Sequence, residues 1–125
     1  MAKKKPNKKE SRFQHEVIRE LEERLPGCVV MKNATGLKDG FPDISVYHGN
    51  HWAMLECKRS EGESHRPNQD WWVDHLNEMS FASFIYPENR QVVMQQVVNY
   101  LSEAEQAAGY SQEEEEDGHE LESAC

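Results

Sequence analysis

Several features are missing from this chain of 125 residues, and each absence argues against a class of protein. Neither a run of about 18 apolar residues nor a signal-peptide core is present, so we expect a soluble intracellular protein without a membrane partner. Only three cysteines occur, Cys28, Cys57 and Cys125, without CxxC spacing, which fits a reducing compartment and no structural zinc site. The six histidines form no HxxxH or HxH pair with a third ligand nearby. We expect His48 and His51, which flank a tight turn, to be solvated.

Charge is distributed unevenly along the chain, whose formal net charge is −9. Residues 1–9 carry five lysines and no acid, which predicts a basic flexible arm. Everything from Glu103 onward carries nine acids and no base, so we expect residues 103–125 to form a helix end and an acidic disordered tail. Taking both ends away leaves −5 on residues 10–102, the expected folded domain. The tail has a solubilising role or, alternatively, a DNA-mimicking or self-inhibitory one.

Hydrophobic periodicity predicts the element order αβββαβα in one small α/β domain, with a mixed sheet flanked by helices. We expect helices over 10–25, 67–79 and 88–107, and strands over 28–32 and 81–86 on either side of a central hairpin. Two start signals compete for the first helix, since NKKE and SRFQ are both typical of capping boxes. The N-cap is therefore Asn7 or Ser11.

The central stretch PDISVYHGNHWAMLECK is typical of a β-hairpin, because Gly49 and Asn50 form a two-residue turn signal of type II′. Facing residues then have numbers that sum to 99, which places Asp43 directly opposite Glu56. Because side chains alternate along a strand, Lys58 shares the face of Glu56. Like charges in directly opposed positions destabilise a sheet, so two facing acids require a chemical reason.

A divalent cation would make these facing carboxylates favourable. Mg²⁺ takes oxygen ligands and keeps several waters, so Asp43, Glu56 and the backbone carbonyl of Cys57 would suit a partial cage. We expect Mg²⁺, with Mn²⁺ as a substitute. Lys58 would lie at the rim, where its ammonium can orient or activate an attacking water and balance the charge of a phosphate.

These residues carry a family resemblance. Pro42-Asp43 and Glu56-Cys57-Lys58 resemble the motif of the PD-(D/E)xK nuclease superfamily, and over residues 10–101 the chain is most similar to small stand-alone VRR-NUC proteins and related phage or archaeal Holliday-junction resolvases. The similar segments are ESRFQ, GFPDISV, LECKRS and RPNQDWW. The resemblance implies a restriction-endonuclease-like core, metal-dependent cleavage of DNA phosphodiesters, a homodimer, and a bacterial or phage-infected cell as its cytoplasmic location. It also adds Gln69, at the start of helix 67–79, to the active site.

An acid on the first helix would complete the site, and helix geometry favours Glu10. At about 100° per residue, the apolar stripe from Phe13 to Ile18 centres near Glu10, whereas Glu16 falls roughly 140° away. Glu10 is therefore expected to point inward, as a catalytic and metal-binding residue. The alternatives are a capping-box role for Glu10 with Asn7, and Glu16 as the active acid.

Four side chains near the expected site are candidates for DNA contact: Lys32, Lys38, His65 and Arg66. Arginine suits bidentate phosphate binding, and basic arms bind phosphates through salt-sensitive contacts. Because the folded part is acidic, we expect weak DNA binding without Mg²⁺. Of two adjacent tryptophans, Trp72 continues the face of Gln69 and is expected in the core, which leaves Trp71 at a dimer or nucleic-acid surface.

Together these observations predict a metal-dependent DNA endonuclease, and the family resemblance implies selectivity for branched DNA, such as a Holliday junction or a flap. Alternatives within enzymes are an exonuclease and a restriction-type nuclease. Outside enzymes they are a non-catalytic DNA-binding subunit with the same fold, and a small acidic interaction protein in which Asp43 and Glu56 never meet. A hairpin register shifted by one residue would favour the last, since the two acids would then lie on opposite faces.

Overall fold

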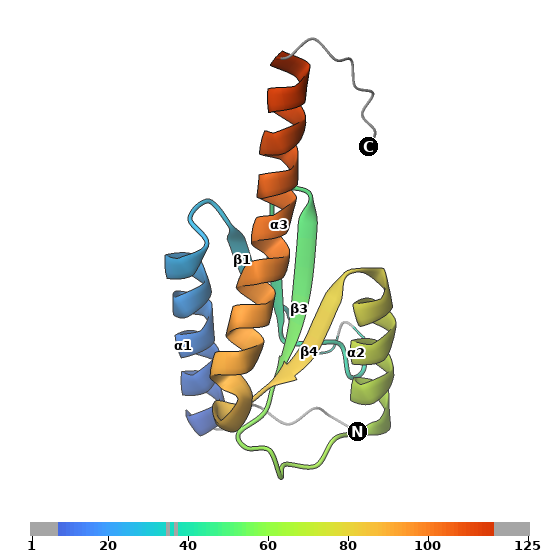
Figure 1. The fold of residues 1–125 in the computed structure, drawn as a ribbon. Coiled ribbons are helices and arrows are strands. Elements are labelled where there is room, and N and C mark those ends of the chain that lie inside the picture. Colours follow the sequence, from blue (N-terminus) through green and yellow to red (C-terminus); the bar gives the residue numbers. More distant parts are fainter. Residues whose placement is uncertain (1–7, 35, 37, 117–125) are drawn as a thin grey trace.

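The computed structural model describes residues 8–34, 36 and 38–116, within which a four-stranded mixed sheet is covered by three α-helices (Figure 1). The elements follow in the chain as α1 (Lys8–Arg24), β1 (Val29–Lys32), β2 (Ile44–His48), β3 (His51–Cys57), α2 (Pro67–Met79), β4 (Phe81–Ile85), the 3-10 turn η1 (Pro87–Asn89) and α3 (Arg90–Glu116). The predicted α/β class and element order are confirmed. Over these described ranges, no helix is both long enough and apolar enough to cross a membrane.

The strands lie in the order β1-β2-β3-β4, and the hairpin of β2 and β3 has the predicted register. Both pairings along β2 are antiparallel, whereas β3 and β4 run parallel with α2 as their connection. Tyr47 lies opposite Trp52, and Ser45 opposite Met54, so the shifted register is excluded. Gly49 has a φ of 62°, and no described residue other than glycine has a positive φ, which fits a type II′ turn.

Alternation along the strands gives the sheet two faces, and each has its own helices (Figure 1). One face packs against α1 and α3 in the larger core, whose fully buried members include Val17, Leu21, Ile44, Leu55 and Val97. α2 covers the other face over β3 and β4, in a smaller core of Met54, Val73, Leu76 and Ala82. Trp72 packs against this smaller core and Trp71 is 55% exposed, as predicted.

The helix ends differ from the predictions. α1 begins at Lys8, so Ser11 is inside the helix and is not its N-cap, and Asn7 lies outside the described residues. Lysine and glutamate are good helix formers, which lets the helix start earlier. The remaining residues of the predicted basic arm, 1–7, are outside the described residues as well.

α3 begins at Arg90, after a separate 3-10 turn, and continues to Glu116 instead of ending near 107. The part of the tail from 108 to 116 that we expected to be disordered is therefore helical, in keeping with its content of alanine, glutamine and glutamate. Residues 117–125 of the predicted tail lie outside the described residues.

His48 is buried, although its position beside the turn predicted a solvated side chain. Its ring nitrogen Nδ1 lies 3.3 Å from the backbone carbonyl oxygen of Leu101, and the residue is only 9% exposed. α3 contacts β2 and covers the turn end of the hairpin on this side. Packing of α3 therefore buries His48, although the turn sequence around this residue predicted exposure to solvent.

Candidate active site

Asp43 lies just before β2, and hydrogen bonds hold it beside the end of β3. Its Oδ2 accepts a hydrogen bond of 2.9 Å from the backbone N–H of Cys57. On the other side, the backbone N–H of Asn33 donates to the carbonyl oxygen of Asp43 at 2.7 Å, and the Asn33 side chain donates to the Pro42 carbonyl at 2.9 Å. The carboxylate of Asp43 is thereby fixed next to the residue that follows Glu56.

The loop before Asp43 is packed against the start of α2 at Gly40. A Cβ at Gly40 would lie 2.7 Å from the Cβ of Asn68, and the φ of Gly40 is +84°, so both space and backbone require glycine there. Asp39 accepts hydrogen bonds from the Asn68 side chain at 2.9 Å and, through its carbonyl, from the Trp72 indole at 3.2 Å. No sequence pattern predicted this contact. It fixes the position of the loop before Asp43 against α2.

Glu56 is a buried carboxylate in β3, on the sheet face that α2 covers. The residue is 4% exposed, and its Oε2 accepts a hydrogen bond of 3.0 Å from Nε2 of Gln69. Its other oxygen, Oε1, is buried without a hydrogen-bond partner among the described residues. A buried polar atom of this kind is uncommon, and a carboxylate oxygen in this position is suited to bind a metal ion.

Gln69 connects Glu56 to Lys58 through its amide group. Its Oε1 accepts hydrogen bonds from Nζ of Lys58 at 2.7 Å and from the backbone N–H of Arg66 at 3.0 Å. Lys58 Nζ also donates to the carbonyl oxygen of Ser64 at 3.2 Å, and the lysine is as buried as Glu56. Gln69 therefore holds both the carboxyl group of Glu56 and the ammonium of Lys58 in place, and it also satisfies a backbone group at the N-terminus of α2.

The electrostatics of the site raise the pKa of two of its carboxyl groups, those of Glu56 and Glu10. Burial, and then the nearby charge of Asp43, raise the pKa of Glu56 to about 9. Burial, followed by the charges of Asp43 and Glu63, also raises the pKa of Glu10. Burial raises the pKa of the Cys57 thiol well above its ordinary value, and that side chain packs in the larger core on the other face of the sheet, which leaves the backbone carbonyl as the group of Cys57 that could bind a metal.

The donor set fits a hard divalent cation that retains waters. In the described part of the chain, no three His, Cys, Asp or Glu side chains are placed to hold a metal ion by themselves. The predicted set of Asp43, Glu56 and the Cys57 carbonyl supplies oxygen atoms only, as Mg²⁺ prefers, and water would complete its shell. The partnerless Oε1 of Glu56 fits such a ligand position.

The structure places Glu10 at this site and Glu16 elsewhere. The charges of Asp43, Lys58 and Arg59 act on Glu10, which is half-buried in the first turn of α1. Glu16 points toward α3, where its Oε1 accepts a hydrogen bond of 3.1 Å from Nη1 of Arg90. Of the two alternatives for the first-helix acid, Glu10 is the one within electrostatic reach of Asp43 and Lys58, and its role in the site stays a prediction.

Two of the four candidates for DNA contact already pair with carboxylates, and the other two are exposed. Arg66 Nη1 lies 3.3 Å from Oδ1 of Asp39. His65 Nδ1 lies 2.8 Å from Oδ1 of Asp70, and its ring stacks on Phe84 with centroids 4.0 Å apart. Lys32 and Lys38 are exposed. The two lysines are therefore available at the surface, whereas Arg66 and His65 already have carboxylate partners.

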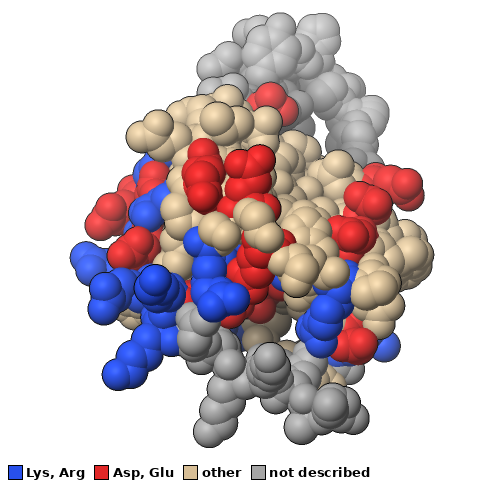
Figure 2. Space-filling view, turned by 90° about the horizontal axis from the view of Figure 1, so that it is seen from below, with Lys and Arg blue, Asp and Glu red and all other residues tan. Residues whose placement is uncertain are grey.

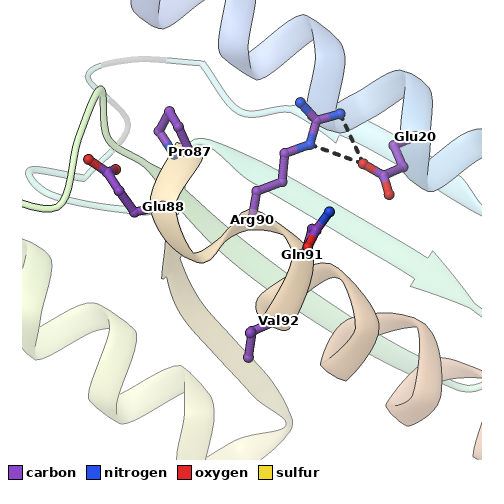
Figure 3. A pocket seen from close by; sticks show the side chains of 6 residues that line it. All are labelled: Glu20, Pro87, Glu88, Arg90, Gln91 and Val92. Atoms are coloured by element: carbon purple, nitrogen blue, oxygen red, sulfur yellow. Dashed lines mark hydrogen bonds and ion pairs between the residues drawn. The ribbon is translucent and has the colours of Figure 1, made fainter.

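A hollow of about 480 Å³ lies away from these residues, between α1 and the start of α3 (Figure 3). Its lining consists of Glu20, Pro87, Glu88, Arg90, Gln91 and Val92. Arg90 reaches across to α1, where its Nε and Nη2 donate to Oε1 of Glu20 at 3.0 and 2.9 Å. The cation of this hollow is thus already neutralised, and none of the predicted site residues lines it.

Comparison with known proteins gives a match at the level of structure. No family model matches the chain, and no curated protein matches its sequence. A solved structure described as a VRR_NUC domain is similar, with a TM-score of 0.57 and 20% sequence identity, over 75% of this chain and 98% of that one. The chain therefore has the fold of that domain, and the predicted small α/β fold with a mixed sheet flanked by helices is confirmed.

Proposed function

We propose that the chain is a metal-dependent deoxyribonuclease with Asp43, Glu56 and Lys58 at its catalytic centre. The observation that carries the proposal is the buried Glu56 carboxylate, which has one oxygen without a partner and is linked through Gln69 to a buried lysine. A pKa raised by burial and a neighbouring acid is typical of a functional site. The likeness to a structure described as a VRR_NUC domain supports a nuclease over other functions of an α/β fold.

The residues of the site have separate roles in this proposal. Asp43, Glu56 and the Cys57 carbonyl would hold Mg²⁺ or Mn²⁺, with Glu10 as a further carboxyl group beside them, and the bound metal would supply an activated water and stabilise charge on the phosphate. An ammonium group has three N–H donors, and Lys58 uses two of them on Gln69 and Ser64. The third donor is left for the attacking water or a phosphate oxygen. Because both partners are fixed, Lys58 is oriented before the substrate arrives.

The proposed substrate is branched DNA, as the family resemblance implies. The proposed assembly is a homodimer, because a chain with one active site cuts two strands symmetrically only when two copies act together. The outer part of one sheet face supports the dimer. α2 covers β3 and β4 there, whereas Val29, Met31 and Tyr47 of β1 and β2 are between 41% and 54% exposed. Val29 lies opposite Tyr47 in the sheet, so these apolar side chains form one patch.

The test is cleavage of labelled four-way junction, flap, linear duplex and single-stranded DNA with Mg²⁺ or Mn²⁺. We expect Asp43→Ala to abolish cutting and Lys58→Ala to slow it by roughly 100-fold or more. Asp74→Ala, at an exposed position of α2, is the matched control and should cut like the wild type. Thermal unfolding of each variant checks that the loss is not a loss of fold.

The ranking of substrates separates the possible nucleases from one another. Preference for the junction supports a resolvase, and preference for ends or for duplex supports an exonuclease or a restriction-type enzyme. A wild type that binds DNA without cutting it would instead be a non-catalytic subunit. One that neither binds nor cuts would contradict the nuclease proposal and favour the acidic interaction protein.

A further inference from the structure

A second hollow, of about 210 Å³, adjoins the candidate active site. We call it the α1 hollow, and its lining residues are Lys9, Arg12, Phe13, Glu16, Arg59 and Pro87. None of the proposed catalytic residues lines it, but Lys9 directly precedes Glu10 in α1, and Arg59 is close enough to Glu10 for its charge to lower the pKa of that carboxyl group, so the hollow lies near the first-helix acid. Figure 2, which views the lower end of the molecule, shows Lys and Arg side chains gathered beside acidic ones on this face.

The α1 hollow is positively charged although the chain as a whole carries −9. Neither Lys9 nor Arg12 forms an ion pair with another described residue. Arg59 lies 3.5 Å from Oε1 of Glu63 through its Nε, and its side chain remains 47% exposed. The one carboxylate of the lining, Glu16, is bound by Arg90 from outside the hollow. Lys9 and Arg12 are thus two cations without an ion-pair partner among the described residues, Arg59 is a third that is shared with Glu63, and the acid of the lining is already neutralised.

We propose that the α1 hollow binds a phosphate of the DNA strand beside the one that is cut. This inference rests on the proposed nuclease function and deepens it. A guanidinium presents paired N–H donors that match phosphate oxygens, and Arg12 and Arg59 approach from two different elements. About 10–15 Å³ suffices for one water, so the volume admits a phosphate with several waters.

Arg12 and Arg59 act in this proposal as positioning residues. Phosphate contacts fix the register of a protein on nucleic acid, while the chemistry takes place at another phosphate. DNA carries a phosphate every 3.4 Å of helix axis on each strand, so a strand held in the catalytic centre brings a neighbouring phosphate close by. The ligand is either an internal diester of the strand or a terminal 5′-phosphate, since both present the same oxygens.

The test compares Arg12→Gln and Arg59→Gln with Arg19→Gln. Arg19 is an exposed arginine on the same side of α1, about 10 Å along the helix from Arg12 and outside the lining of the hollow. Fluorescence anisotropy in EDTA measures binding of one labelled duplex, with a 5′-phosphate or a 5′-hydroxyl, between about 50 and 200 mM salt. The kcat and KM for cleavage of the same duplexes are measured with Mg²⁺.

We expect each of the two variants to bind roughly tenfold more weakly than the wild type. The slope of log affinity against log salt should fall by about 0.9 for each lost contact, and KM should rise while kcat stays nearly constant. Arg19→Gln should behave as the wild type. Arg12→Lys should recover the salt slope but not the full affinity, because lysine lacks the paired donors. A loss confined to 5′-phosphorylated DNA assigns the ligand as a terminal phosphate, and an equal loss on both duplexes assigns it as an internal one.

The proposal is overturned if Arg12→Gln and Arg59→Gln have the same DNA affinity, salt slope and KM as the control Arg19→Gln. So would a wild type that binds neither duplex at the lowest salt. The two proposals fail in different ways. If the wild type cuts DNA with metal and the variants behave like it, only the proposal of a phosphate site in the α1 hollow fails. If no protein cuts DNA but the variants bind it more weakly, the nuclease proposal fails and the phosphate site stands.

Discussion

Replacing Glu56 by glutamine tests whether the buried carboxylate destabilises the metal-free protein. Burial and the charge of Asp43 raise the pKa of Glu56 from an ordinary value of 4.5 to about 9. Between these values the carboxyl group is ionised in the unfolded chain and protonated in the folded one. Folding therefore takes up a proton, and the contribution of Glu56 to stability is fully present below pH 4.5 and decreases as the pH rises toward 9.

The size of the effect at pH 7 follows from the interval between pH 4.5 and pH 7. Each pH unit in it lowers the free energy of unfolding by about 1.4 kcal/mol, so the wild type loses up to about 3 kcal/mol. Glutamine does not titrate, and its carbonyl oxygen can still accept the hydrogen bond from Gln69. We expect Glu56→Gln to match the wild type near pH 4.5 and to exceed its unfolding free energy by up to about 3 kcal/mol at pH 7.

Urea unfolding followed by circular dichroism, at pH 5 and pH 7 in EDTA, measures this difference. Glu78→Gln removes an exposed carboxylate from α2 and is the matched control, with an expected change within about 0.5 kcal/mol at both values. Mg²⁺ should stabilise the wild type and not Glu56→Gln, because a ligand stabilises the state that binds it. If the variant is less stable than the wild type at pH 7, or if its advantage is the same at both pH values, the reasoning is refuted.

Three other changes test neighbouring parts of the structure. Gln69→Ala leaves Lys58 and Glu56 without their shared partner, so the unfolding free energy should fall by about 1–3 kcal/mol, and an unchanged urea midpoint would contradict the role of the amide. Gly40→Ala places a Cβ against Asn68 at a positive φ and should cost about 1–3 kcal/mol and slow DNA cleavage, while Gly62→Ala, with nothing within 4 Å, should be neutral in both assays. Met31→Lys should shift the proposed dimer toward monomer in sedimentation, and a wild type that sediments as a monomer would remove the dimer proposal.

The central hairpin could be predicted from sequence because its determinants are local. Gly49 and Asn50 fix a two-residue turn, and the period of two along the strands then places every side chain on one face or the other. The shared face of Glu56 and Lys58 follows from the same alternation, whereas Gln69, which contacts both, was expected only from the family resemblance. For the same reason the element order could be deduced, since each helix has an apolar stripe of its own.

The contacts that the sequence did not predict join segments that are distant in the chain. Asp39 and Gly40 pack against α2, and nothing in their local sequence indicates that partner. His48 is buried because α3 covers the end of the hairpin, not because of any signal beside the turn. Arg12 and Arg59 meet around one hollow only after α1 has packed on the sheet. Local pattern predicts elements and register, whereas these sites depend on how the elements dock.

The charges near the site indicate an order in which DNA is bound. A strand that approaches the metal-free protein meets Asp43 and Glu63, whose charges raise the pKa of Glu10. The α1 hollow can attract one phosphate through Arg12, but the phosphate to be cut must enter the acidic part of the site. A divalent cation reverses the sign of that part and leaves the hollow unchanged. Binding in EDTA should therefore depend mainly on the hollow, and the further affinity gained with Mg²⁺ should be lost in Asp43→Ala and retained in Arg12→Gln.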